Sequence, residues 1–158
     1  MIVYPIGASG QALVLSDIVL EHLKSQRQIE PRIPEAGGQL FARFVAREIR
    51  IEEATGPHPT DKRGRTFYRP DRRAERKEIQ DRYRSGLHYV GDWHTHPSTR
   101  PEPSSTDLRN IKECFLRSRH ELNGFVLIIV GTAPPPEGLR ISVNDGIDDF
   151  VLREEDPT

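Results

Sequence analysis

The sequence predicts an α/β fold in which a mixed β-sheet is sandwiched by helices. Three helical segments, beginning near Ser16, Pro70 and Ser104, are interleaved with short apolar runs that are typical of strands. The run at residues 125–130 is apolar at every position, which indicates a strand buried on both faces. A chain of 158 residues is long enough to bury a substantial core in one domain.

The N-terminal half predicts mainly strands. Short apolar runs place them at residues 1–6, 12–15, 39–46, 47–54 and 66–69. Ser16 is a good N-cap, and the helix that it begins carries Ile18, Val19, Leu20 and Leu23. The polar segment at residues 55–65 is expected to be a loop.

The C-terminal half alternates helices and strands. A highly charged helix is expected at residues 70–85, followed by a strand in which apolar residues alternate up to Trp93. Ser104 caps a helix whose apolar face comprises Leu108, Ile111 and Phe115. After the buried strand at residues 125–130, the alternation of Leu139, Ile141 and Val143 predicts a half-buried strand.

The segment that joins the strand of Trp93 to the helix capped by Ser104 contains a candidate metal site. His94 and His96 lie two residues apart, so on a strand they point the same way and converge on one ion. Asp107 falls in the first turn of the helix capped by Ser104 and points back toward the strand end. Two imidazoles and one carboxylate are typical of catalytic zinc, with the fourth position left for water. The single cysteine, Cys114, excludes a closed thiolate site and is expected to be a small core residue.

Each of these residues has an ordinary interpretation when taken alone. A pair of histidines is usually a surface or strand feature, and an acid three residues after a serine N-cap is usually a capping residue. Together, however, the residues form the pattern H-x-H-P-x6-S-x-x-D. The capping and metal-binding interpretations of Asp107 are compatible, because one carboxylate can do both.

Upstream, Glu35 stands in E-x-G-G directly before a predicted strand. With H-x-H-P-x6-S-x-x-D, this resembles the JAMM metallopeptidases of the JAB/MPN-plus superfamily. The resemblance implies that His94, His96 and Asp107 bind one Zn2+ per chain. It further implies that Glu35 is the general acid/base and that Ser104 stabilises the oxyanion.

The resemblance covers nearly the whole chain. It implies one JAB/MPN metallopeptidase domain at residues 1–158, with a cytidine-deaminase-like arrangement. The sequences I-E-E-A-T-G-P at residues 51–57 and G-D-W-H-T-H-P at residues 91–97 are similar to a narrower group. This group comprises stand-alone bacterial JAB isopeptidases of cyclase-based antiphage (CBASS) operons and integrative elements.

The narrower resemblance implies a conjugated protein substrate. The favoured partner is the C-terminus of a cGAS/DncV-like nucleotide cyclase, together with a ubiquitin-activating/conjugating-like fusion enzyme whose attachment the isopeptidase reverses. One alternative is a processing protease for a ubiquitin-like or sulfur-carrier precursor or a phage-tail protein. The other is a non-catalytic MPN scaffold, against which the complete motif argues.

Composition predicts a cytoplasmic protein without a membrane or nucleic-acid partner. The formal net charge is −1, and the longest strongly apolar run, residues 125–130, is too short to span a bilayer. Residues 56–86 contain ten Lys/Arg against five Asp/Glu. They form either a solvated helix with pairs such as Asp81 near Lys77, or a basic face for an acidic partner.

Two expectations concern the surroundings of the site. JAMM enzymes hold the modifier's tail as an added strand, and the resemblance therefore implies an open strand edge near residues 55–68. Asp92 shares strand parity with His94. It is either a hydrogen-bond partner of a metal ligand or a solvated acid at the strand end.

Overall fold

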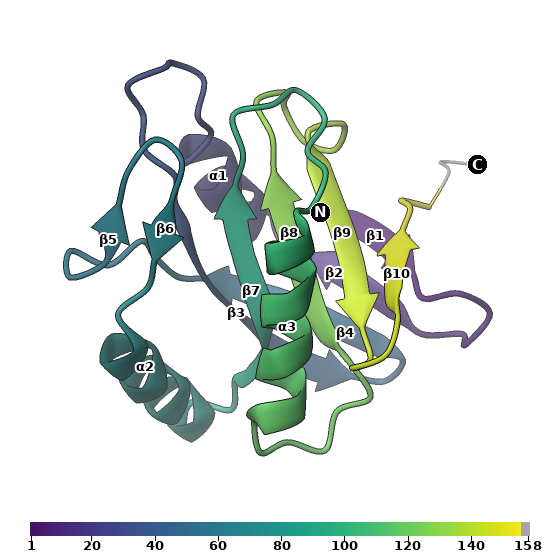
Figure 1. Cartoon of the computed structure of the whole chain (residues 1–158). Helices are drawn as coiled ribbons and strands as arrows, with labels where there is room; N and C mark the ends of the chain where they lie inside the picture. The colour runs from purple at the N-terminus through teal and green to yellow at the C-terminus, as the bar shows by residue number, and fades with distance from the viewer. Residues whose placement is uncertain (156–158) are drawn as a thin grey trace.

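The computed structural model describes residues 1–155 and confirms the predicted α/β class (Figure 1). An eight-stranded sheet has the order β1-β2-β4-β3-β7-β8-β9-β10, and a separate hairpin is formed by β5 and β6. The strands are β1 (Ile2–Pro5), β2 (Ala12–Leu15), β3 (Gly37–Val45), β4 (Glu48–Ala54), β5 (Lys62–Arg63), β6 (Tyr68–Arg69), β7 (His88–Thr95), β8 (Phe125–Val130), β9 (Leu139–Asn144) and β10 (Asp149–Leu152). The helices are α1 (Asp17–Ser25), α2 (Arg72–Arg84) and α3 (Ser105–Arg117).

Helices lie on both faces of the sheet. In Figure 1, α1 lies behind the sheet, and α3 lies in front of β7 and β8. The even-numbered residues of β8 belong to the core cluster that contains Val19 and Leu23 of α1. The odd-numbered residues of β8 pack in a second cluster with Ile111 of α3. All six residues of β8 are buried, as the unbroken apolar run predicted.

The far strand of the sheet was not predicted from the sequence. β10 pairs antiparallel with β9, and Asp149 accepts hydrogen bonds from Ser142 Oγ (3.0 Å) and Arg140 Nη2 (3.1 Å). Ser142 and Asn144 are therefore buried, and the half-buried prediction for β9 is wrong on its polar side. Beyond β10, Glu155 N donates to Val3 O of β1 at 2.9 Å, so the two ends of the sheet meet.

The charged helix forms where it was predicted, but with different ion pairs. Asp71 is the N-cap of α2. Asp81 pairs with Arg84 at 3.4 Å rather than with Lys77, and Arg82 Nε donates to Glu53 of β4 at 3.0 Å. No helix within residues 1–155 has the length and apolar character needed to cross a membrane.

The two glycines at the start of β3 are required by close packing. A Cβ on Gly38 would lie 1.6 Å from the carbonyl oxygen of Thr55, and a Cβ on Gly37 would lie 2.6 Å from the ring of Tyr68. The Thr55 oxygen cannot easily move, because it accepts a hydrogen bond from the buried Trp93 Nε1 at 2.8 Å. The absence of side chains at Gly37 and Gly38 thus allows Thr55 and Tyr68 to pack directly against the start of β3, beside the candidate site.

Gly38→Ala is expected to lower the free energy of unfolding by about 3 kcal/mol, because backbone must shift to admit the methyl group. Urea denaturation measures this loss. Gly7→Ala is the control, because it adds the same methyl group at a position where no atom lies within 4 Å of the new carbon. Its positive φ should cost only about 1 kcal/mol. Equal losses in the two variants would contradict the packing explanation.

Candidate metal centre

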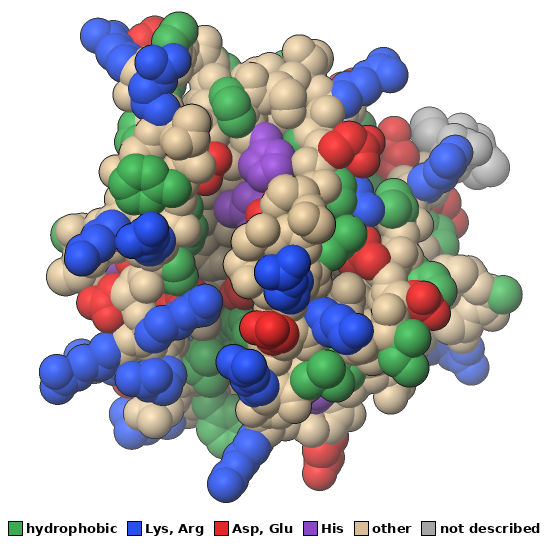
Figure 2. Space-filling model, viewed as in Figure 1, with side chains coloured by type: hydrophobic (Ala, Val, Ile, Leu, Met, Phe, Trp, Pro, Cys, Tyr) green, Lys and Arg blue, Asp and Glu red, His purple; other side chains and the backbone are tan. Residues whose placement is uncertain are grey.

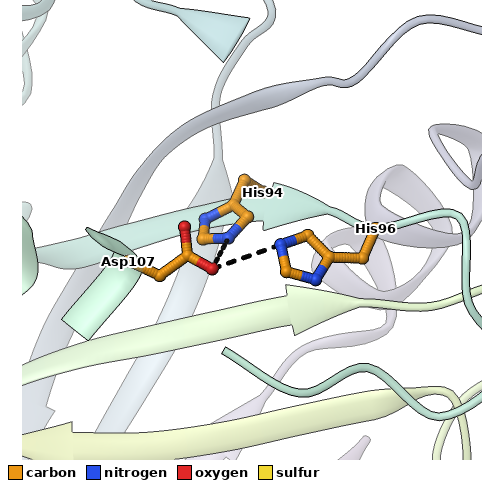
Figure 3. A group of neighbouring side chains, drawn as sticks. All are labelled: His94, His96 and Asp107. Carbon is orange, nitrogen blue, oxygen red and sulfur yellow. Dashed lines mark ion pairs between the residues drawn. The ribbon is translucent and has the colours of Figure 1, made fainter. Parts of the chain in front are cut away.

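The structure brings His94, His96 and Asp107 together (Figure 3). His94 lies near the end of β7, His96 follows that strand, and Asp107 lies in the first turn of α3. Asp107 Oδ2 is 3.3 Å from His94 Nε2 and 3.2 Å from His96 Nε2. Each side chain is 18–20% exposed, so the group is sheltered but reachable from solvent.

Helix capping determines where the Asp107 carboxylate points. Ser104 Oγ accepts a hydrogen bond from Asp107 N at 3.0 Å, and Asp107 Oδ2 accepts one from Ser104 N at 2.8 Å. This is the reciprocal capping box that stabilises a helix N-terminus. The same oxygen of Asp107 faces both imidazoles, so the two interpretations of this residue from the sequence are compatible in space as well.

The electrostatics of the group favour a cation. Burial raises the pKa of Asp107, but the two imidazoles beside it outweigh this and hold the pKa well below its usual range. The hydrogen bond with Asp107 raises the pKa of His96, against the opposing effect of burial. The carboxylate is therefore ionised, and positive charge beside it is stabilised.

One atom of this group has no hydrogen-bond partner. His94 Nε2 is buried and makes no hydrogen bond among residues 1–155, although it lies 3.3 Å from Asp107 Oδ2. A buried polar atom without a hydrogen bond is costly in a folded protein. Coordination to a metal ion would satisfy it. Two imidazole nitrogens and one carboxylate oxygen are the donor set of catalytic zinc sites, so these residues fit the ion.

Sheet register places Glu35 beside this group. β3 runs antiparallel to β7 with Gly37 opposite His94, and Ala36 O accepts a hydrogen bond from Thr95 N at 2.9 Å. Glu35 therefore lies opposite His96, and it lines a cleft of about 130 Å³ together with His94 and Asp107. Burial raises the pKa of Glu35, while His96 and His94 act to lower it. A raised pKa suits a carboxyl group that accepts and then releases a proton.

Ser104 is exposed and is held by its role as N-cap. Because its oxygen accepts from Asp107 N, its own hydroxyl proton remains available to another acceptor. All five residues of the sequence motif thus lie at one end of β7.

Residues 16–142 match the family model described as prokaryotic homologs of the JAB domain. The chain belongs to this family. The matched range contains Glu35, both histidines, Ser104 and Asp107, so the geometry described above lies entirely within the JAB domain.

Two relatives and one solved structure are similar to this JAB domain. The CD-NTase/cGAS isopeptidase of Enterobacter hormaechei subsp. hoffmannii (strain UCI 50) is 32% identical over 124 residues, which cover 77% of this chain and 68% of the relative. The probable metalloprotease y4qB of Sinorhizobium fredii (strain NBRC 101917 / NGR234) is 48% identical over 54 residues, 32% of this chain and 33% of the relative. The solution structure of protein DSY2949 from Desulfitobacterium hafniense has a TM-score of 0.61 and 21% identity, and the match covers 91% of this chain and 90% of that chain. The last similarity shows that the fold is shared.

The hairpin of β5 and β6 holds the Glu35 segment of the JAB domain, and its role was missed from the sequence. Glu35 N donates to Gly64 O at 2.8 Å, and Arg63 Nε donates to Glu35 O at 2.7 Å. Tyr68 OH donates to Gly37 O at 2.8 Å. The segment expected to offer an open strand edge, residues 55–68, contains part of this hairpin, which packs on the E-x-G-G motif and pairs with no further strand among residues 1–155. That this edge accepts a substrate tail stays a prediction.

Asp92 matches neither interpretation from the sequence. It accepts a hydrogen bond from Tyr89 OH at 2.7 Å rather than from a histidine, and burial raises its pKa. Cys114 packs against the α3 side of the core, as predicted. Its sulfur lies 3.2 Å from Tyr89 OH, and burial raises the pKa of its thiol, so it is a poor nucleophile.

Glu75 of α2 lines the same cleft and is expected to make stability depend on pH. It is 7% exposed; burial and the charge of Asp92 raise its pKa to about 7, and Arg72 opposes the shift. The folded state therefore binds more protons than the unfolded state between about pH 4.5 and 7, and stability falls as pH rises through this window. At pH 8, the unfolding free energy of Glu75→Gln should be roughly 3 kcal/mol higher than that of the wild type. Near pH 4.5 the two unfolding free energies should be equal. Urea denaturation at both pH values measures this; a difference independent of pH would contradict it.

Proposed function

We propose that this JAB-domain protein is a zinc-dependent isopeptidase. The observation that carries the proposal is the group of His94, His96 and Asp107, with an unpaired buried nitrogen, beside a carboxyl group that is not part of it. A metal-binding group flanked by a free general base is the arrangement of hydrolytic zinc sites. Relatives named as an isopeptidase and a probable metalloprotease support the same chemistry.

The proposed roles follow from position. His94, His96 and Asp107 would hold the ion, which when bound supplies Lewis-acid polarisation of a carbonyl and lowers the pKa of water. Glu35 accepts a proton from the attacking water and delivers it to the departing amine. Ser104 Oγ donates a hydrogen bond to the oxyanion as it develops. No side chain forms a covalent bond to the substrate.

The proposed substrate is a protein conjugate whose acyl component is the C-terminus of a cGAS/DncV-like nucleotide cyclase. The name of the Enterobacter hormaechei relative, CD-NTase/cGAS isopeptidase, supports this choice. The partner enzyme would be a ubiquitin-activating/conjugating-like fusion whose attachment is reversed in an antiphage system. We propose the bacterial cytoplasm as the place where this reaction occurs.

A substrate trap tests the proposal. Glu35→Ala protein is expressed in native-like cells, and whatever it retains is identified by mass spectrometry. Recovery of one protein's C-terminus joined to lysines of other proteins is the expected result and names the modifier. Recovery of an uncleaved linear precursor would replace the isopeptidase with a processing protease.

Arg63 is expected to position Glu35 during turnover. Arg63→Met removes the 2.7 Å hydrogen bond to Glu35 O, and kcat should fall about tenfold to a hundredfold because a catalytic group is displaced. Metal content and KM should not change, and Arg63→Lys should recover part of the rate. Arg65→Met, an exposed neighbour in the same hairpin, is the matched control. A rate unchanged in Arg63→Met would rule out this positioning role.

A further inference from the structure

A groove runs away from the metal site between α2 and α3. The two helices lie apart in front of the sheet, and Figure 2 shows the surface hollowed between them below the histidines. Two hollows follow each other here. The upper one, of about 130 Å³, is lined by Glu35 and by two members of the metal-binding group, His94 and Asp107. The lower one, of about 850 Å³, is bordered by residues that include Arg76, Ile79, Tyr83, His88, Tyr89 and Arg119.

The two hollows share a floor and a wall. β7 forms the floor, and the 2.7 Å hydrogen bond from Tyr89 OH to Asp92 joins the lower hollow to the upper one. On α2, each residue that lines the two hollows lies three or four positions from another one, so they share one helix face: Arg72, Glu75, Arg76, Ile79 and Tyr83. One face of α2 and the strand β7 thus border both hollows, which follow each other from the metal site toward the start of β7.

The lower hollow combines aromatic rings with cations that make no ion pair in the part of the chain that the structure describes. Tyr83 is 68% exposed, and its ring lies 5.8 Å from that of His88. Arg76 of α2 and Arg119 after α3 both border this hollow, whereas the ion pairs of these helices use Arg72, Arg82, Arg84 and Arg117 instead. Glu121 is the only acid that lines this hollow among residues 1–155. Figure 2 shows Lys and Arg side chains along both rims.

The length of β7 relates the lower hollow to the reaction. His88 and His94 are six residues apart on this strand. At about 3.3 Å per residue, they are separated by about 20 Å, the length of six extended residues. On the amine side of an isopeptide bond, a lysine side chain is too short to cover this distance. An extended segment of that length is found on the acyl side, in the C-terminal tail.

We propose that this groove binds an acidic C-terminal tail of the conjugated substrate. Carboxylates of the tail, about six residues before the scissile bond, pair with Arg76 and Arg119, and an apolar or aromatic side chain packs on Tyr83 and His88. This assignment rests on the proposed isopeptidase function and specifies its substrate.

The distribution of charge favours a peptide over a nucleic acid. The upper hollow is lined by Glu35, Glu75, Asp92 and Asp107 against Arg72, so it is acidic. A nucleic acid carries a phosphate at every nucleotide and would meet this repulsion along the groove. A peptide can carry carboxylates only where Arg76 and Arg119 lie.

Binding of synthetic peptides tests the proposal without turnover. Three fluorescein-labelled 12-residue probes share one tyrosine and otherwise Gly/Ser residues, and differ only near the sixth position from the C-terminus, where they carry Asp/Glu, Gln/Ser or Lys residues. A single-stranded 12-nucleotide DNA is the fourth probe. Fluorescence anisotropy with zinc-loaded protein should give a Kd for the acidic peptide about tenfold lower than for the Gln/Ser peptide. Arg76→Glu/Arg119→Glu should remove this preference. Lys77→Glu, on the same helix but outside both hollows, should change Kd less than about twofold.

The outcomes separate the groove from the reaction. Equal Kd values for the acidic and neutral peptides, equal effects of the two charge reversals, or tighter binding of the DNA would each overturn the groove assignment. In a second assay, an acidic or neutral 12-residue peptide is joined through its terminal carboxyl to a lysine reporter. For the acidic conjugate, Arg76→Glu/Arg119→Glu should raise KM about tenfold and leave kcat unchanged. Cleavage of both conjugates with equal KM would leave the isopeptidase intact and reject the groove, whereas selective binding without any cleavage would reject the isopeptidase.

Discussion

Glu35→Gln is expected to abolish turnover while leaving the metal in place. The carboxyl group lies opposite His96 in the sheet register and in the same cleft as the metal-binding group, yet it is not part of that group. Glutamine has nearly the same shape but cannot accept a proton. The loss in kcat should therefore be about 10²- to 10⁴-fold, the usual contribution of a positioned general base.

Three measurements make this result specific. Cleavage of a lysine-linked reporter gives kcat, elemental analysis gives zinc per chain, and urea denaturation shows that the fold is retained. Glu30→Gln is the matched control, because Glu30 is an exposed acid five residues upstream that pairs with Arg32. Retained turnover in Glu35→Gln, with zinc bound, would require another base and would refute the proposed mechanism.

Two substitutions of Asp107 are expected to distinguish its role in metal binding from its role in helix capping. Asp107→Ala removes the oxygen that faces both imidazoles and also the capping acid of α3. Zinc per chain should fall from one to nearly zero, and activity should disappear. Loss of the hydrogen bond from Ser104 N and of the contact with the two imidazoles should additionally cost the metal-free protein at least about 1 kcal/mol in unfolding free energy.

Asp107→Asn isolates the two effects. An amide oxygen can still accept the hydrogen bond from Ser104 N, but it is a weak zinc ligand, so this variant should lose zinc and, in the metal-free form, be more stable than Asp107→Ala. Wild-type protein in zinc at 100 times its Kd should gain about 2.7 kcal/mol over its metal-free form, and neither variant should gain it. Stoichiometric zinc in Asp107→Ala would show that Asp107 is not a ligand.

The elements that were predicted correctly depend on local patterns. The serine N-caps at Ser16 and Ser104 begin α1 and α3, because a hydroxyl that accepts a backbone N–H is effective wherever it stands. The two-residue spacing of His94 and His96 brings their side chains together for a similar reason, since strand geometry repeats every two residues.

The predictions that failed required knowledge of distant partners. β9 has the alternation of a half-buried strand, yet Ser142 is buried because Asp149 of the unpredicted β10 accepts its hydrogen bond. Asp81 has a suitable lysine four residues earlier, but Arg84 pairs with it. Nothing in the local sequence marks Arg63 as a positioning residue. It lies 28 positions after Glu35, and only the packing of its hairpin brings the two residues into contact.

The chain's own sequence was sufficient for the α/β class and for the proximity of His94, His96 and Asp107, because periodicity, capping and residue spacing act within a few residues. Tertiary structure was needed to place Glu35 opposite His96, since only the register between β3 and β7 relates residues so far apart along the chain. It also created the groove between α2 and α3. The side chains of that groove come from separate helices and strands, and no local pattern encodes the distance between them.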